Sequence, residues 1–97
     1  MAFFTYIVAS RRNGTLYTGS TDSLIARINQ HREKTRDGFT ARHGVAILVW
    51  YEVHETRHAA FVRERQIKEW KRVWKLELIE KSNPGWRDLL EDFGRPA

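Results

Sequence analysis

Apolar residues along the first third of the chain predict a strand, a tight turn, a second strand and a helix. The first apolar segment, Phe3–Ser10, leads into Asn13-Gly14, a pair that strongly favours a hairpin turn. A short strand over Thr15–Gly19 follows. The next three side chains, Ser20–Asp22, are of the kinds that cap a helix N-terminus, so a helix is expected directly after them.

Apolar positions recur at helical or strand spacing through the rest of the chain as well. Val45–Val53 is almost continuously apolar and predicts a strand buried on both faces, which completes a three-stranded, largely antiparallel sheet. A long helix is expected from Glu55 or Thr56 to about Val73, and another over Trp74–Lys81. The apolar residues of the three expected helices, in order, are Leu24, Ile25 and Ile28; Ala60, Phe61 and Ile67; and Trp74 and Leu78.

Asn83-Pro84 is expected to stop that helix and start a short amphipathic C-terminal one, with Asn at the cap and Pro at the first helical position. Trp86, Leu89, Leu90 and Phe93 follow at helical spacing. The pattern therefore predicts an α+β fold in the order β-β-α-β-α-α, a three-stranded sheet flanked by helices. Residues 1–97 are expected to form a single domain.

Two tyrosines of the hairpin are expected to share one face of the sheet. With the turn centred on Asn13-Gly14, Ser10 pairs with Tyr17, and alternate residues place Tyr6 on the same side as Tyr17. Ordinary packing is one explanation for strand tyrosines. Gly19 lies on that face too, and a glycine inside a strand often marks the close approach of a ligand or of another part of the chain.

Charged side chains lie beside the apolar stripes of two helices. Arg27 and His31 are four residues apart, so they stack on one face next to the stripe, either as packing residues or as a functional pair. Glu64 shares a face with Ala60 and Ile67, where a carboxylate is costly unless a partner compensates it. That partner is either a lysine one or two turns on, Lys68 or Lys71, or a divalent metal ion.

Composition favours a polyanionic partner. Seventeen Lys and Arg against twelve Asp and Glu give a net charge of +5, which suits nucleic acid first and an anionic membrane second, although solubility alone also explains it. The sequence contains no cysteine, which suits a reducing cytoplasm. Its apolar runs are too short to span a bilayer, and no secretory signal is apparent.

Two segments carry candidate nucleic-acid contacts. The charged stretch 32–44 has no apolar periodicity and reads as a long loop, in which Arg36, Arg42 and His43 suit phosphate contact and Phe39 suits base stacking, or simply as a solvated loop. Further along, basic residues alternate with Trp70 and Trp74, which are explained at least as well by packing. The basic residues expected to contact nucleic acid there are Lys68, Lys71 and Lys75.

The order of these residues resembles the GIY-YIG nuclease domain. Thr5-Tyr6, then Tyr17-Thr18-Gly19, Arg27, His31 and finally Glu64 follow the pattern of that family over nearly the whole chain. The likeness is greatest to its small, single-domain bacterial members, predicted endonucleases whose ends resemble Trp74–Leu89. Phe4 and Thr18 depart from the two name-giving triplets, while both triplets keep their tyrosine.

The resemblance implies a metal-dependent, structure-specific endonuclease that acts on DNA in preference to RNA. It implies a role in DNA repair or processing, with a protein partner for targeting. It implies catalytic roles for Tyr6, Tyr17, Arg27, His31 and Glu64, with Glu64 as ligand of Mg²⁺ or Mn²⁺. Tyr17 would accept the proton of the attacking water and Arg27 would hold the phosphate. Asn83 matches a downstream asparagine of many such enzymes, but capping explains it. The alternatives are an inactive nucleic-acid-binding module and a small interaction subunit.

Overall fold

A three-stranded antiparallel sheet forms the centre of the protein, with strand order β2-β1-β3. A computed structural model describes residues 2–33 and 47–93. The predicted α+β fold is confirmed. Its elements are β1 (Phe3–Ala9), β2 (Leu16–Thr21), α1 (Leu24–Glu33), β3 (Ile47–His54), α3 (Arg57–Lys68), α4 (Arg72–Ser82) and the short 3₁₀ helix η2 (Leu89–Asp92).

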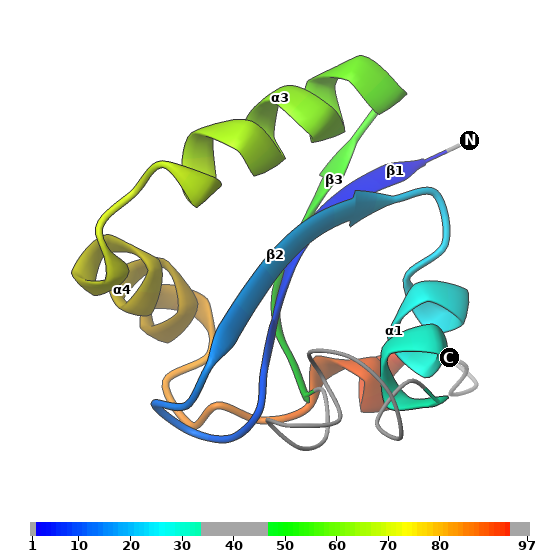
Figure 1. Cartoon of the computed structure of the whole chain (residues 1–97). Helices are drawn as coiled ribbons and strands as arrows, with labels where there is room; N and C mark the ends of the chain where they lie inside the picture. The colour runs from blue at the N-terminus through cyan, green and yellow to red at the C-terminus, as the bar shows by residue number, and fades with distance from the viewer. Residues whose placement is uncertain (1, 34–46, 94–97) are drawn as a thin grey trace.

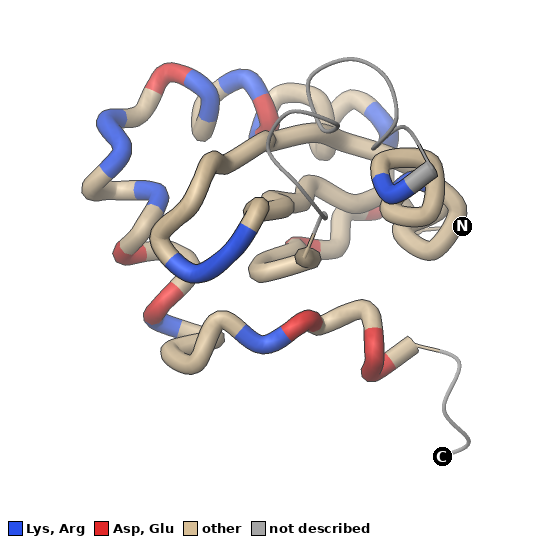
Figure 2. Tube along the Cα trace, turned by 60° about the horizontal axis from the view of Figure 1, so that its bottom comes forward, with Lys and Arg blue, Asp and Glu red and all other residues tan. Residues whose placement is uncertain are grey.

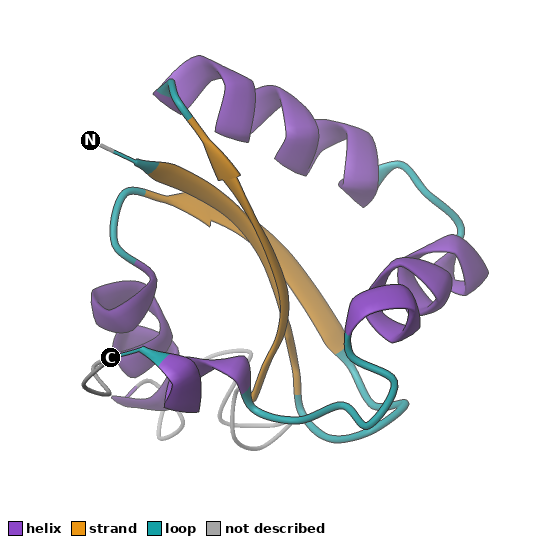
Figure 3. Ribbon diagram, turned by 180° about the vertical axis from the view of Figure 1, so that it is seen from behind, coloured by secondary structure: helices purple, strands orange, loops and turns teal. Residues whose placement is uncertain are grey.

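Helices cover both faces of the sheet (Figures 1 and 3). Helices α3 and α4 lie on one face, where Ile67 and Ile79 pack against Ile7 of β1. Helix α1 lies on the other face with η2, and Leu24 and Ile28 pack there against residues of β1 and β3. Two separate apolar clusters therefore hold the central strand, so every side chain of β1 from Thr5 to Ala9 is buried.

A β-bulge lets β3 supply both clusters. Ile7 pairs with Trp50 and Val8 pairs with Leu48, so Val49 is an extra residue without a partner on β1. A bulge interrupts the alternation of side chains along a strand, so two successive side chains can lie on the same face. Val49 and Trp50 accordingly join the cluster beneath α3 and α4, whereas Leu48 joins the one beneath α1. The predicted burial on both faces is thus found over residues 48–50, whereas Val53 near the end of the strand is 58% exposed.

The hairpin turn is wider than the two-residue turn that we expected. The N–H of Ser10 donates to the carbonyl of Thr15, and the N–H of Gly14 donates to that of Arg11, which closes a four-residue turn. Asn13 takes a left-handed conformation there, with φ of 58°. Val8 therefore pairs with Tyr17, not with Gly19. A shift of two residues keeps every side chain on its predicted face.

Helix boundaries and exposure differ from the prediction in two ways. The long helix ends at Lys68, and α4 starts at Arg72, earlier than expected. Ile25 and Phe61 were expected in the core, but both are largely exposed. The buried stripe of each helix is narrower than the apolar pattern suggested, because the whole sheet has only three strands and β2 is an edge strand.

The C-terminal segment crosses from one face of the sheet to the other. Instead of starting a helix at Pro84, the chain turns at Trp86, whose φ is 56°, and Trp86 packs beneath α4. Leu89, Leu90 and Phe93 pack on the opposite face. The apolar spacing that predicted one amphipathic helix therefore arises from residues that serve two different clusters, and the helix that forms is only the η2 turn.

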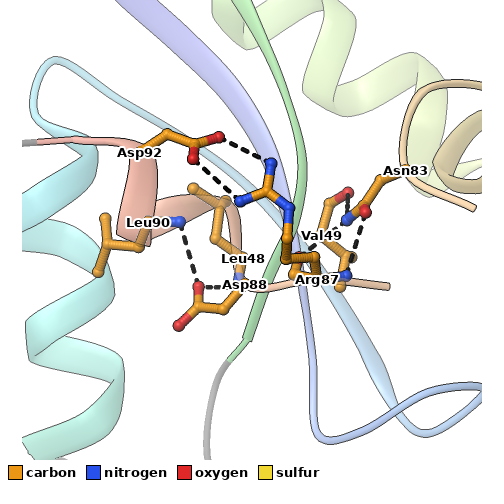
Figure 4. Close-up of polar contacts among 7 residues, drawn as sticks. All are labelled: Leu48, Val49, Asn83, Arg87, Asp88, Leu90 and Asp92. Carbon is orange, nitrogen blue, oxygen red and sulfur yellow. Dashed lines mark hydrogen bonds and ion pairs between the residues drawn. The ribbon is translucent and has the colours of Figure 1, made fainter. Parts of the chain in front are cut away.

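Asn83 is the anchor of this crossing (Figure 4). Its buried side-chain amide donates to the carbonyl oxygens of Val49 and Arg87, and its carbonyl oxygen accepts from the N–H of Arg87. The carbonyl of Val49 is available because the bulge removes that residue from the ladder. Asn83 ends α4 as its C-cap, so it caps the helix that precedes it and not the one that we expected after it.

No helix in the described part of the chain is long and apolar enough to cross a membrane.

Candidate functional site

Tyr6 lies at the centre of a polar cluster on the α1 face of the sheet. Its side chain is wholly buried, and its hydroxyl lies 3.0 Å from Nε2 of His31. Arg27 donates to the same hydroxyl from Nε at 3.3 Å. Arg27 and His31 are one turn apart on α1, as their spacing predicted, and both reach inwards over β1.

Burial keeps the phenol of Tyr6 neutral. Desolvation raises the pKa of Tyr6 to about 12, and the opposing hydrogen bond and charge of Arg27 only partly offset it. The same contact, followed by hydrogen bonding to Tyr17, raises the pKa of Arg27 above its already high value. Near neutral pH the cluster therefore holds a protonated phenol beside a permanently charged guanidinium, and the guanidinium is a donor suited to an anion.

Tyr17 lies beside this pair on β2 and is only partly buried. Its ring centroid is 4.9 Å from that of His31 and 6.4 Å from that of Tyr6. The prediction that the two tyrosines share a face is confirmed in spite of the shifted register. The close approach expected at Gly19 is also present, and the group that comes close is the Tyr6 ring of the same protein.

Glu64 comes to the site from the opposite face of the sheet. It projects from α3 with 9% of its surface exposed, and its Oε1 accepts from the hydroxyl of Ser20 at 2.7 Å. Its Oε2 pairs with Nζ of Lys68 at 2.6 Å. The lysine that sequence analysis named as one possible partner is thus the one that compensates the carboxylate.

Lys68 connects the two groups around the edge of the sheet. Its Nζ lies 5.8 Å from the centroid of the Tyr17 ring while it pairs with Glu64. Because β2 is an edge strand, a side chain from α3 passes beside it and meets residues of the other face. Glu64 is also near enough to contribute to the raised pKa of Tyr6. The five residues predicted from separate segments therefore form one neighbourhood.

A divalent metal ion at this site would be held by Glu64. The described residues contain no group of three or more His, Asp and Glu side chains that would form a complete metal site. A single carboxylate completed by water and phosphate oxygens is nevertheless a usual arrangement for Mg²⁺. Lys68 would have to leave Oε2, and its side chain is 44% exposed and flexible enough to do so. The residues present therefore fit such an ion.

The predicted nucleic-acid contacts are not all part of this cluster. Lys68 belongs to it, but Lys71 lies at the N-cap of α4 with its Nζ 5.9 Å from the Trp74 ring, and Lys75 lies one turn further along. Lys and Arg positions recur through α3 and α4, interspersed with acids (Figure 2). Arg36, Arg42, His43 and Phe39 lie outside the described residues.

A polar depression that the sequence did not predict lies next to the cluster. It lies between the end of β2, the start of α1 and the start of α3, and it reaches Arg27 on one side and Arg57 on the other. Ser20–Asp22 were expected only to cap a helix. Three successive polar side chains at the end of a strand were the signal that could have indicated a polar depression there. The lining residues are Ser20, Thr21, Asp22, Ser23, Ala26, Arg27, Gln30 and Arg57.

Comparisons with known proteins identify the family of this chain. The model of the GIY-YIG catalytic domain matches residues 2–77. UPF0213 proteins of Staphylococcus aureus strains Mu50 and N315 are each 36% identical over 78 residues, which cover 80% of this chain and 94% of theirs. The solution structure of the UPF0213 protein from Bacillus halodurans superposes with a TM-score of 0.56 at 22% identity, over 99% of this chain and 100% of that one, which shows the shared fold. The chain therefore belongs to the GIY-YIG catalytic domain family.

Proposed function

We propose that this protein is a metal-dependent endonuclease that hydrolyses phosphodiester bonds of nucleic acid, with DNA as its principal target. Membership of the GIY-YIG family supports nuclease-type chemistry and binding of nucleic acid. The observation that carries the proposal is the single neighbourhood formed by Tyr6, Tyr17 and Glu64, which come from three different elements. Arg27 and His31 complete it.

The two tyrosines take different roles because their surroundings differ. Tyr17 is partly exposed and lies near the cations of Arg27 and Lys68. We therefore assign it the role of the base that accepts the proton of the attacking water. Tyr6 is buried with a pKa of about 12, which makes it a poor base and a persistent donor. Because its side chain is wholly buried, its hydroxyl acts on the substrate through Arg27 and His31, which it holds in place.

Arg27 supplies charge where negative charge develops. Its guanidinium presents N–H donors in a planar fork and remains protonated at every physiological pH. It can therefore bind the scissile phosphate and the more highly charged transition state. His31 lies against both tyrosine rings, with Nε2 at the Tyr6 hydroxyl, and orients them. The hydrogen bond between Tyr6 and Arg27 fixes the guanidinium on the side of the sheet where Tyr17 lies.

Glu64 would hold a Mg²⁺ or Mn²⁺ ion, assisted by water and by phosphate oxygens. When bound, such an ion neutralises charge on the phosphate and assists departure of the leaving oxygen. Ser20 keeps the carboxylate aimed at the strand edge through Oε1 and leaves Oε2 to the exchangeable Lys68. A role in DNA repair or processing in the cytoplasm, with a targeting partner, would be consistent with a basic protein of this size.

A second function is favoured by one specific contact. Both oxygens of Glu64 already have partners, and a lysine pair is sufficient to explain a carboxylate in this position. A protein in which Glu64 and Lys68 stay paired while nucleic acid is bound would hold the nucleic acid through its cations without cutting it. The alternative to an endonuclease is therefore an inactive binding module or an interaction subunit.

Cleavage with Glu64→Ala separates these functions. We expect the wild-type protein to cut a panel of branched, single-stranded and duplex substrates with Mg²⁺ or Mn²⁺, and Glu64→Ala to lose at least about a hundredfold in rate, as for loss of a principal electrostatic group. Glu69→Ala, which removes the same charge five residues further along the chain, at the C-cap of α3, is the control. Binding without cleavage in every metal would exclude the enzyme and leave the binding module.

A further inference from the structure

One line of side chains on α3 follows β2 along its length. Arg57, Phe61, Glu64 and Lys68 are spaced by three or four residues and so share one face of the helix, which we call the α3 edge stripe. Three of its members contact residues of β2 or the residue just beyond its end. Arg57 pairs with Asp22 at 3.2 Å, Glu64 bonds to Ser20 and Lys68 lies over Tyr17.

Phe61 is the remaining member of the stripe, and it is 49% exposed. It stands one turn from Glu64 on one side and one turn from Arg57 on the other. Isolated exposed apolar side chains are common on protein surfaces. This one differs because its neighbours on the same face form the proposed site and the wall of the polar depression, which Arg57 lines together with Arg27.

One cation lies beside the Phe61 ring, and two more lie on the same face of α3. The guanidinium of Arg65 lies 5.9 Å from its centroid, and Arg57 and Lys68 occupy the two ends of the stripe. The acids there, Asp22 and Glu64, are paired with Arg57 and Lys68, so Arg65 tips the balance towards positive charge. An exposed aromatic ring flanked by basic side chains is the combination that binds a nucleotide, with the base on the ring and its phosphates at the cations.

We propose that Phe61 is the stacking platform for an unpaired base next to the phosphodiester bond to be cut, with Arg57 and Arg65 at the adjoining phosphates. This inference rests on the proposed function and adds to it a substrate class, nucleic acid with an unpaired nucleotide at the site. Paired bases within a duplex already stack on one another and present no free face to the ring. A single strand, a flap or the unpaired junction of a branch presents one.

Trp74 provides a matched control for this test. Its side chain is also 49% exposed, and it also has a cation beside it, with Nζ of Lys71 at 5.9 Å. It belongs to α4 and lines a separate groove with Trp70, Leu78 and Lys81. A general effect of removing any exposed aromatic from a basic surface would therefore appear equally in Trp74→Ala and in Phe61→Ala.

The experiment measures binding of a fluorescent single-stranded DNA oligonucleotide and of the matching duplex by anisotropy, without metal ion. We expect Phe61→Ala to weaken single-strand binding about tenfold, in keeping with the loss of one base–aromatic stack. Duplex binding should change by less than about twofold, because no base is free to stack. Phe61→Trp should retain tight single-strand binding, and Trp74→Ala should resemble the wild type. Thermal unfolding of each variant shows that the fold is retained.

Several results would overturn the inference alone. They are unchanged single-strand binding in Phe61→Ala, equal losses for single strand and duplex, or a loss of the same size in Trp74→Ala. Failure of the wild-type protein to bind either nucleic acid would instead overturn the proposed function, and this inference with it. The Glu64→Ala cleavage assay tests the chemistry separately, since it depends on the carboxylate and not on the ring.

Discussion

The hydroxyl of Tyr6 rests on Gly19 so closely that a Cβ atom at position 19 would lie 2.5 Å from the phenolic oxygen. The two residues are cross-strand partners, so the tyrosine ring folds over its own neighbour in the sheet. The ring is wholly buried and is held by Arg27 and His31, which leaves it little room to move away. Gly19 thereby sets the height of the Tyr6 hydroxyl above the sheet.

Replacing this glycine is expected to disturb both the fold and the site. Gly19→Ala should lower the free energy of unfolding by about 1–3 kcal/mol, the usual cost of forcing extra volume into a packed interior. It should also lower nuclease activity, because the phenol must shift. Urea unfolding provides the measurement, and Gly85→Ala is the control because a Cβ there meets nothing within 4 Å. Equal stability of the two variants would contradict this explanation.

Tyr6 should ionise later than an ordinary tyrosine. The protein has three tyrosines, and burial raises the pKa of Tyr6 to about 12. In an ultraviolet titration of the folded protein, the component lost in Tyr6→Phe should therefore appear near pH 12 and not near pH 10. Titration of that component at the ordinary pH would show that the Tyr6 hydroxyl is not desolvated.

The same pKa predicts how stability changes at high pH. Between about pH 10 and 12 the unfolded chain releases the Tyr6 proton while the folded protein keeps it, so the folded state binds more protons. The stability contributed by Tyr6 is therefore complete below pH 10 and declines as pH rises towards 12. The wild-type protein should lose more stability than Tyr6→Phe over this interval. Comparing the two proteins cancels the contribution of the other titrating groups.

Asn83 should be structural and not catalytic. Its side-chain amide holds the carbonyl of Val49 and the backbone of Arg87, and Val49 belongs to the apolar cluster beneath α3 and α4. Asn83→Ala leaves buried polar groups without partners, and we expect a loss of about 3 kcal/mol in the free energy of unfolding. The exposed Asn29→Ala is the control. Cleavage by folded Asn83→Ala should be close to that of wild type, and a loss of rate without a loss of stability would contradict the assignment.

The fold was predictable because apolar periodicity and turn residues agree along most of the chain. The Asn13-Gly14 pair identified the hairpin, although it could not determine the loop length, because Asn13 alone takes the left-handed conformation. Phe61 and Ile25 were misplaced since periodicity reveals which residues share a face but not how far the sheet extends beneath them. The C-terminal spacing failed for a related reason, because Trp86 and Leu89 pack in different clusters.

The site was predictable in its members but not in its arrangement. Spacing placed Tyr6 and Tyr17 on one face, and it placed Arg27 beside His31. It could not show that Glu64 approaches from the other face, because that depends on β2 being an edge strand past which Lys68 can reach. Arg57 entered the neighbourhood only through its distance to Asp22, which lies thirty-five positions earlier in the sequence.

Alternate residues of β2 serve opposite layers of the protein. Tyr17 and Gly19 look towards α1 and the phenol cluster, whereas Ser20 looks towards α3 and its carboxylate. Alternating side chains of one six-residue strand thus face the two sides of the sheet. A substitution on one side of this strand is therefore felt on the other chiefly through Lys68, which pairs with Glu64 and lies over the Tyr17 ring.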